Sequence, residues 1–400
     1  MSQDTPKRKG RADATQKLSL AACAGMFVFG LANALLGAVL PLLAGRLHFD
    51  LAHSGKLFLI LNFGVLLCVV GMGPLMDRYG MKAAMVIGPL LVAVAMTGIE
   101  LVPSYRWLAA GCFLLGLGGG ALNSATNTLV ADLHQDPMHK NSALAFLGVF
   151  FGAGALLVPL GVGSLIERVR LGPILFGAAV LCALAGAYPA ALSFPPAKYG
   201  GNQPPAKLLR FLGNRSVWIF GAMVMLQSGN EIVLAGYVTT YLITYLGASV
   251  SKASWLLTAL WVSVIVSRLL LAKLLLRASG RLVVLCSAIV SAAGAGSFLL
   301  AVTHTQAVAA LMVTGAGLAG VFPTVMGMAG ARFHDHSGTV FGFLLTMGRM
   351  GAMAFPFATG VWAEDVGLRT AMAVLVVNAL VIAGLQGLAR TSASPEDAAG

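Results

Sequence analysis

The chain has 400 residues, of which 58% are hydrophobic and 10% are charged. A soluble domain has about 25% charged residues, so this composition cannot build a water-facing surface and excludes a soluble globular protein. The formal net charge of +12 does not indicate nucleic-acid binding, because the basic residues fall in short breaks between apolar runs, as the positive-inside rule describes. We therefore expect a polytopic membrane protein with no nucleic-acid partner.

Apolar runs separated by short polar breaks predict twelve membrane-spanning helices, because about 20 helical residues cross a bilayer. Residues 1–17 precede the first run and form a basic tail. Prolines inside the runs do not contradict this prediction, since neighbouring helices can satisfy the freed backbone groups. The predicted spans are 18–45, 54–76, 83–102, 107–131, 142–166, 171–194, 216–246, 251–275, 282–302, 306–331, 338–363 and 367–389.

The longest polar break, residues 195–215, is rich in proline and has no apolar periodicity. We interpret it as a cytoplasmic linker between an N-terminal six-helix bundle, 18–194, and a C-terminal six-helix bundle, 216–390. A short tail, 391–400, follows. Lysine and arginine concentrate in alternate breaks, which predicts that both termini are cytoplasmic and that the protein lies in a bacterial-type inner membrane.

The two halves contain similar stretches at a separation of about 200 residues. Gly154-Ala-Leu-Leu-Val-Pro159 in the fifth span corresponds to Gly351-Ala-Met-Ala-Phe-Pro356 in the eleventh. This internal pseudo-repeat indicates a duplicated all-α membrane fold. Two six-helix halves with a solute site between them near the midplane are the plan of alternating-access transporters.

Two ionisable residues lie deep in predicted spans, where a charge is costly and function is the default hypothesis. Glu231 is near the middle of the seventh span and Arg349 near the middle of the eleventh. Burial disfavours a charged carboxylate, which suits a group that binds and releases a proton, so we predict proton coupling by Glu231. Alternatively, the two side chains form a structural ion pair, and proton transfer then requires the pair to break.

Amide side chains form a second set of candidates. Asn123 and Asn127 are spaced i and i+4, hence on one face of the fourth span, and Asn33 is similarly deep in the first. Amides offer donors and acceptors without charge, which suits neutral polar solutes, although interhelical hydrogen bonding is the alternative. The predicted solute-binding residues are Asn33, Asn123, Asn127, Gln227, Asn230 and Arg349.

The break between the second and third spans reads Gly73-Pro-Leu-Met-Asp77-Arg78-Tyr-Gly80-Met-Lys82. A glycine here permits a tight connection at the membrane face, and the charges stay in the headgroup region. An ordinary positive-inside turn is the alternative to a functional loop. We predict that Gly73, Asp77, Arg78, Gly80 and Lys82 take part in conformational gating.

This loop resembles the signature of the major facilitator superfamily between its second and third helices. The fourth span, Gly229-Asn-Glu231 and the stretch Gly315–Thr324 resemble the fucose permease-like branch, which implies a twelve-helix fold and proton-linked uptake of a sugar. Gly37 and Asn123 stand where fucose–proton symporters have carboxylates. The coupling route of those symporters therefore cannot be copied here. Glu231 matches an acidic position common in the permease-like members, so the resemblance implies that it is the best candidate for coupling.

No nucleophile–base pair, phosphate-cradling loop or metal-ligand spacing occurs in the sequence. We therefore expect no enzyme, no catalytic residue, no metal and no cofactor. The predicted function is secondary transport of a small polar solute by a monomer in the lipid bilayer, with a proton or sodium as coupling ion. Alternatives are an exporter of amphipathic compounds, a transporter of an organic anion that uses Arg349, and a non-transporting sensor.

Overall fold

The computed structural model describes residues 5–101, 103–133, 137–195, 213–274, 278–333 and 337–388. The predicted tail 391–400 and residues 196–212 of the predicted linker 195–215 lie outside these residues. The first helix begins at Thr5, inside the predicted basic tail.

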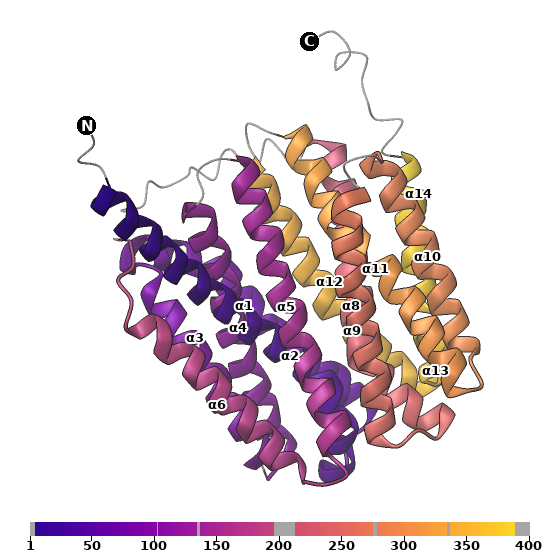
Figure 1. The fold of residues 1–400 in the computed structure, drawn as a ribbon. Coiled ribbons are helices and arrows are strands. Elements are labelled where there is room, and N and C mark those ends of the chain that lie inside the picture. The colour runs from indigo at the N-terminus through magenta and orange to yellow at the C-terminus, as the bar shows by residue number, and fades with distance from the viewer. Residues whose placement is uncertain are drawn as a thin grey trace. The chain divides into compact units, whose positions relative to one another are not determined.

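All regular secondary structure of the described residues is helical (Figure 1). Helices satisfy their own backbone hydrogen bonds, which hydrocarbon requires. The helices are α1 (Thr5–Leu47), α2 (Leu51–Tyr79), α3 (Lys82–Leu101), α4 (Tyr105–Leu133), α5 (Pro137–Leu165), α6 (Leu171–Ala190), α8 (Arg215–Leu246), α9 (Val250–Leu274), α10 (Gly280–Leu300), α11 (His304–Arg332), α12 (Ser337–Val366), α13 (Leu368–Ala371) and α14 (Val374–Leu388).

Twelve helical stretches of the described chain are long and apolar enough to cross a membrane. Each of them overlaps one predicted span, so the predicted fold class is confirmed. The last stretch combines α13 and α14, with a break at Met372 and Ala373. Large apolar side chains such as Leu67, Val94 and Val377 stay exposed, as expected for helix faces that contact lipid rather than water.

The chain folds into two compact units. Unit 1 consists of residues 1–36 and 60–201, and unit 2 consists of residues 37–59 and 202–400. Helices α1 and α2 therefore contribute to both units. Within unit 1, α3 packs on α4 and α6, and within unit 2, α8 packs on α12 and α10 on α11.

Close helix contacts in unit 1 use glycines of α1 and α5. A Cβ atom at Gly154 would collide with the carbonyl oxygen of Phe27, and one at Gly30 would collide with that of Phe151. Small residues let two helix backbones approach closely in a bilayer, where van der Waals packing and not the hydrophobic effect drives helix association.

The corresponding helices of unit 2, α8 and α12, pack in the same way. A Cβ atom at Gly351 would collide with the carbonyl oxygen of Met225, and one at Gly348 would lie 3.0 Å from Oγ of Ser228. Gly351 and Gly154 are the glycines that open the two repeated stretches of the sequence. The internal repeat therefore corresponds to one packing contact that both units make.

Candidate functional site

Helix α8 carries Glu231 near its middle. The helix starts after Asn214, whose side chain accepts a hydrogen bond from the Ser216 N–H, and it ends at Gly247, which has the left-handed φ of 63° that glycine adopts without strain. The Glu231 side chain is only 20% exposed. A carboxylate at this depth needs a nearby counter-charge or a proton, because burial of an isolated charge is strongly unfavourable.

The counter-charge comes from Arg268 of α9, whose Nη2 lies 4.0 Å from Oε2 of Glu231. That distance is too long for a hydrogen bond, so the two groups form a loose ion pair rather than a bidentate one. Nε of Arg268 is buried and has no hydrogen-bond partner among the described residues. The pair therefore leaves part of the guanidinium fork unused.

Sequence reasoning missed Arg268. The predicted span 251–275 contains it, but Arg268 lies in the second half of that span, a few residues before Lys273. A charge near a span end is usually attributed to the membrane surface. The signal that could have found it is the apolar Leu-Leu-Leu-Ala run that separates it from Lys273 and places it inside the hydrocarbon.

Arg349 of α12 lies within electrostatic range of Glu231. Unit 2 thus contains one carboxylate, Glu231, that is paired with Arg268 and lies within electrostatic range of a second guanidinium group, Arg349. We call these three residues the charged cluster. It can bind anions, exchange a proton at its carboxylate, or do both.

Two predicted solute-binding residues of α8, Gln227 and Asn230, are both about 1% exposed. Nε2 of Gln227 donates to the Leu318 carbonyl at 2.8 Å, and Nδ2 of Asn230 donates to the Leu375 carbonyl at 2.9 Å. Oδ1 of Asn230 accepts from Asn378 at 2.8 Å. These amides join α8 to α11 and α14, so interhelical bonding accounts for them, and a role in solute binding stays a prediction.

The amides predicted in unit 1 have different surroundings. Asn127 of α4 donates to the backbone carbonyl of Asn123 at 2.7 Å and lies 3.2 Å from its side-chain oxygen. The two residues share one helix face, as their spacing predicts. Asn33 of α1 is 9% exposed, and its Oδ1 has no hydrogen-bond partner among the described residues. An unsatisfied buried oxygen is unfavourable, so Asn33 is an amide of unit 1 with unused binding capacity.

The predicted gating residues lie where α2 ends and α3 begins. Gly80 has a φ of 80°, and its N–H donates to the Met76 carbonyl at 2.8 Å, so a glycine is required at this turn. Nζ of Lys82 donates to the Leu192 carbonyl at 3.0 Å, and the Arg78 guanidinium lies 5.3 Å from the ring centre of Tyr79. The surroundings of Gly73 and the side chain of Asp77 lie outside what the structure describes, and gating by this loop stays a prediction.

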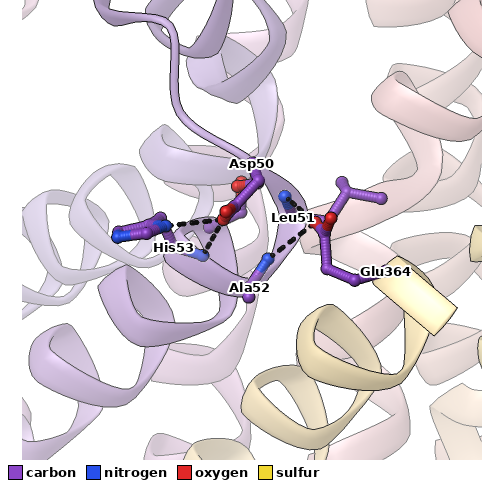
Figure 2. Close-up of polar contacts among 6 residues, drawn as sticks. Asp50, Leu51, Ala52, His53 and Glu364 are labelled. Carbon is purple, nitrogen blue, oxygen red and sulfur yellow. Dashed lines mark hydrogen bonds and ion pairs between the residues drawn. The ribbon is translucent and has the colours of Figure 1, made fainter.

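A second set of polar contacts, which sequence reasoning missed, joins the start of α2 to the end of α12 within unit 2 (Figure 2). The Glu364 carboxylate accepts hydrogen bonds from the N–H groups of Leu51 and Ala52 at 2.6 and 3.2 Å. These are backbone donors that the first turn of a helix leaves unpaired, and a carboxylate there also interacts favourably with the helix dipole. The segment 37–59 is thus attached to unit 2 at its polar connection.

Asp50 caps the same helix start. Its Oδ1 accepts a hydrogen bond from the His53 N–H at 2.7 Å and lies 2.6 Å from the His53 ring (Figure 2). Partial burial raises the pKa of the Asp50 carboxyl, but the two hydrogen bonds with His53 and the charges of His53 and Lys56 together lower the pKa below its ordinary value. Asp50 therefore caps the start of α2 in its ionised form.

Apolar and backbone contacts extend this attachment along α1 and α2. Oγ1 of Thr239 donates to the Gly37 carbonyl at 2.7 Å, and a Cβ atom at Gly37 would collide with the Ala235 carbonyl. The ring of Phe58 lies 5.5 Å from that of Tyr237. Glycine at position 37, where the fucose–proton symporters have a carboxylate, is explained here by close packing of α1 on α8.

The chain matches a family model described as Major Facilitator Superfamily over residues 22–245 and 217–398. It is 24% identical over 376 residues to an "uncharacterized MFS-type transporter YfkL" of Bacillus subtilis (strain 168), covering 88% of this chain and 91% of that protein. The crystal structure of a nucleoside transporter, NupG, superposes with a TM-score of 0.77 at 16% identity, covering 93% of this chain and 99% of NupG.

The fucose:proton symporter FucP of E. coli superposes with a TM-score of 0.66 at 18% identity, covering 94% of this chain and 99% of FucP. At such identities the solved structures establish a common fold and nothing finer. The family match covers nearly all of the chain, and the relative that aligns with most of it is named as a transporter. The chain belongs to the major facilitator superfamily and is a secondary transporter, not an enzyme.

Proposed function

We propose that the protein moves a small polar solute across the membrane together with protons, and that Glu231 binds and releases the coupling proton. The observation that carries this proposal is the loose ion pair between Glu231 and Arg268, 4.0 Å apart, in the interior of two membrane-spanning helices. An ionisable pair at this depth is costly, and the transport function supplies a reason for it.

The looseness of the pair suits proton exchange. A bidentate pair would hold the carboxylate ionised, whereas this pair makes no hydrogen bond that protonation would have to break. The Glu231 side chain also keeps 20% of its surface exposed, which gives a proton a path to it. Glu231 can therefore alternate between a charged form paired with arginine and a neutral form.

The solute is proposed to be polar because of the amides in unit 1. Asn33 has a buried oxygen without a hydrogen-bond partner among the described residues, and Asn123 and Asn127 line one face of α4. Hydroxyl groups satisfy such amides well. The names of two structural neighbours, a nucleoside transporter and a fucose:proton symporter, refer to solutes rich in hydroxyl groups.

We further propose an inner-membrane location with both termini in the cytoplasm, and a monomer as the working unit. The side assignment is supported by the excess of lysine and arginine in alternate connections. In this arrangement the α2–α3 connection, with Arg78 and Lys82, lies on the cytoplasmic side and takes part in gating. The connection around Asp50 then lies on the opposite side.

Transport in proteoliposomes tests the coupling proposal. The solute is first found by screening radiolabelled sugars, nucleosides and sugar acids, with pH and sodium gradients imposed separately. We expect a pH gradient to drive uptake and a sodium gradient to have no effect. Glu231→Gln should abolish gradient-driven accumulation and retain solute exchange.

Glu167→Gln, which neutralises an exposed carboxylate in the α5–α6 connection, is the matched control and should behave like the wild type. Full gradient-driven accumulation by Glu231→Gln would remove this residue from the coupling mechanism. Uptake driven by sodium alone would replace the proton by sodium.

A further inference from the structure

We infer that the transported solute carries a carboxylate or phosphate group, and that Arg268 and Arg349 bind this group when Glu231 is protonated. This inference rests on the proposed function, because it names the solute class that the same coupling site accepts. The inference goes beyond the proposed function because it gives the two arginines a direct role in solute binding.

The first argument is the charge of the interior around Glu231. Helices α9, α11, α12 and α14 all pack on α8. α14 contains no titratable residue, and the titratable residues of α11, His304 and Arg332, are at its two ends. Away from the helix ends, the charged groups of these five helices are Glu231, Arg268 and Arg349. Residues 37–59 of α1 and α2 also contact α8, through Gly37 and Phe58, and the titratable residues of this segment lie around the α1–α2 connection: Arg46, His48, Asp50, His53 and Lys56.

The charged cluster therefore has one positive charge more than it has negative charges. A surplus charge inside a membrane span is costly, and protonation of Glu231 raises the surplus from one positive charge to two. A monovalent anion that binds with the proton returns the surplus to one, whereas a neutral sugar would leave it at two. A cationic solute would increase it.

The second argument is the incomplete bonding of Arg268. Its Nε is buried without a hydrogen-bond partner among the described residues, and its contact with Glu231 is a 4.0 Å ion pair. Guanidinium presents its donors in a fork that fits a carboxylate or a phosphate with two parallel hydrogen bonds. An anionic solute can supply the bonds that Glu231 does not.

The third argument concerns how the proton and the anion would be linked. Protonation of Glu231 removes the one negative charge of the cluster and leaves two arginines that attract an anion. Loss of the proton restores a carboxylate that competes with the solute for Arg268. Binding of the proton and of the anion then favour each other, and this reciprocity is a thermodynamic requirement.

Each cycle would carry the proton on Glu231 and the anion on the arginines, and both would leave on the other side. The Glu231 carboxylate would replace the solute as the partner of Arg268 at release. The O–H bond of protonated Glu231 is the bond that forms and breaks in this sequence. With a monovalent anion, the total charge of the cluster is the same when proton and solute are both bound as when neither is bound.

Binding measurements on purified, full-length protein in detergent test the inference without any gradient. The probes are acetate and inorganic phosphate as bare anions, and glucuronate and glucose 6-phosphate with glucose as their neutral counterpart, all at constant ionic strength. We expect at least one anion to raise the thermal stability where glucose does not. Arg268→Gln and Arg349→Gln should each weaken anion binding by about tenfold or more.

The pH dependence gives a second readout, with glucuronate as the probe because it stays ionised between about pH 5.5 and 7.5. Affinity of the wild type for glucuronate should rise as the pH falls. Glu231→Gln, which imitates the protonated form, should bind at about pH 7.5 as tightly as the wild type does at about pH 5.5, and should lose the pH dependence.

Two variants keep the test interpretable. Arg281→Gln changes an exposed arginine of α10 and should bind like the wild type. If Arg268→Gln does not fold because it leaves Glu231 without its partner, the double variant Glu231→Gln/Arg268→Gln removes both charges and should fold without binding anions.

The inference is overturned if no probe anion binds better than glucose, or if the arginine variants bind anions like the wild type. If Glu231→Gln nevertheless abolishes proton-driven uptake, the proposed function survives with a neutral solute. Anion binding that depends on Arg268, in a protein whose uptake ignores the pH gradient, would instead refute the coupling proposal and retain anion recognition.

Discussion

Units 1 and 2 use the same packing contact for different chemistry. In unit 1, Gly154 of α5 packs on the Phe27 carbonyl of α1, and in unit 2, Gly351 of α12 packs on the Met225 carbonyl of α8. Asn33 follows Phe27 at the same spacing as Glu231 follows Met225. The duplicated scaffold thus carries an amide in one unit and a carboxylate in the other.

The second helix of the contact, α5 in unit 1 and α12 in unit 2, also carries an uncharged residue in unit 1 and a charged residue in unit 2. Gly152 precedes Gly154 at the spacing at which Arg349 precedes Gly351. The packing glycine and the chemical position lie on different faces of one helix, since residues two apart point in different directions. The chemistry of one unit can therefore change while the helix contact is retained, which explains how a repeated fold supports one neutral and one charged interior.

Disrupting the glycine contact that both units share should have the largest effect on the stability of the protein. Gly154→Ala and Gly351→Ala each place a Cβ atom against a backbone carbonyl that cannot move aside, and overpacking of this kind costs about 1–3 kcal/mol. Both variants should lower the thermal unfolding temperature in detergent and reduce the yield of folded protein.

Gly148→Ala on α5 and Gly342→Ala on α12 are matched controls, because nothing lies within 4 Å of a Cβ atom at either position. These controls should be neutral or slightly stabilising, since alanine favours a helix over glycine by about 0.5–1 kcal/mol. If only one of the two variants, Gly154→Ala or Gly351→Ala, lowered the unfolding temperature, the two contacts would not be equivalent.

The amides sharpen the comparison at a smaller energy scale. Asn230→Leu removes the bond to the Leu375 carbonyl and leaves Asn378 without its acceptor, so it should destabilise unit 2 by about 1–2 kcal/mol. Asn33→Leu removes an oxygen that has no partner among the described residues and should keep the thermal stability.

Solute affinity should respond in the opposite order, with a larger loss in Asn33→Leu than in Asn230→Leu. Thermal unfolding and equilibrium solute binding, measured on the same preparations, check both halves of this prediction. Loss of stability in Asn33→Leu with normal affinity would make that residue a packing amide like Asn230.

The smallest effect is expected at the connection by which the first half of the chain contributes to unit 2. Asp50 stabilises the start of α2 as an ionised cap, and its folded-state pKa is lowered. A lowered pKa means that the stabilisation is present above about pH 4, the ordinary value for aspartate, and is lost as the pH falls through the folded-state value.

Asp50→Ala should therefore lower the stability by about 1 kcal/mol at neutral pH, and its difference from the wild type should shrink below about pH 4. Asp50→Asn keeps an acceptor for the His53 N–H and should cost less. Thermal unfolding from about pH 3.5 to 7 measures both variants, and a difference that does not change with pH would exclude the charge of Asp50 as the cause.

The amino-acid sequence alone determined the twelve spans, the helical class and the superfamily. Apolar length is a local property of the chain, so each span can be recognised without knowledge of its neighbours. The repeated stretches at Gly154 and Gly351 were also visible in the sequence, because glycine at a close helix contact leaves a local signature. Glu231 and Arg349 were found because a charge interrupts an apolar run.

Only the tertiary structure decided which partners these residues have. Arg268 joins Glu231 because α9 packs beside α8. Gln227 and Asn230, four residues and one residue before Glu231 on α8, instead donate hydrogen bonds to the backbone of α11 and α14. The grouping of residues 37–59 with unit 2 likewise depends on contacts between segments far apart in sequence. Hydropathy gives the depth of a residue in the membrane, but its partner depends on the direction in which the side chain leaves the helix and on the helix that stands there.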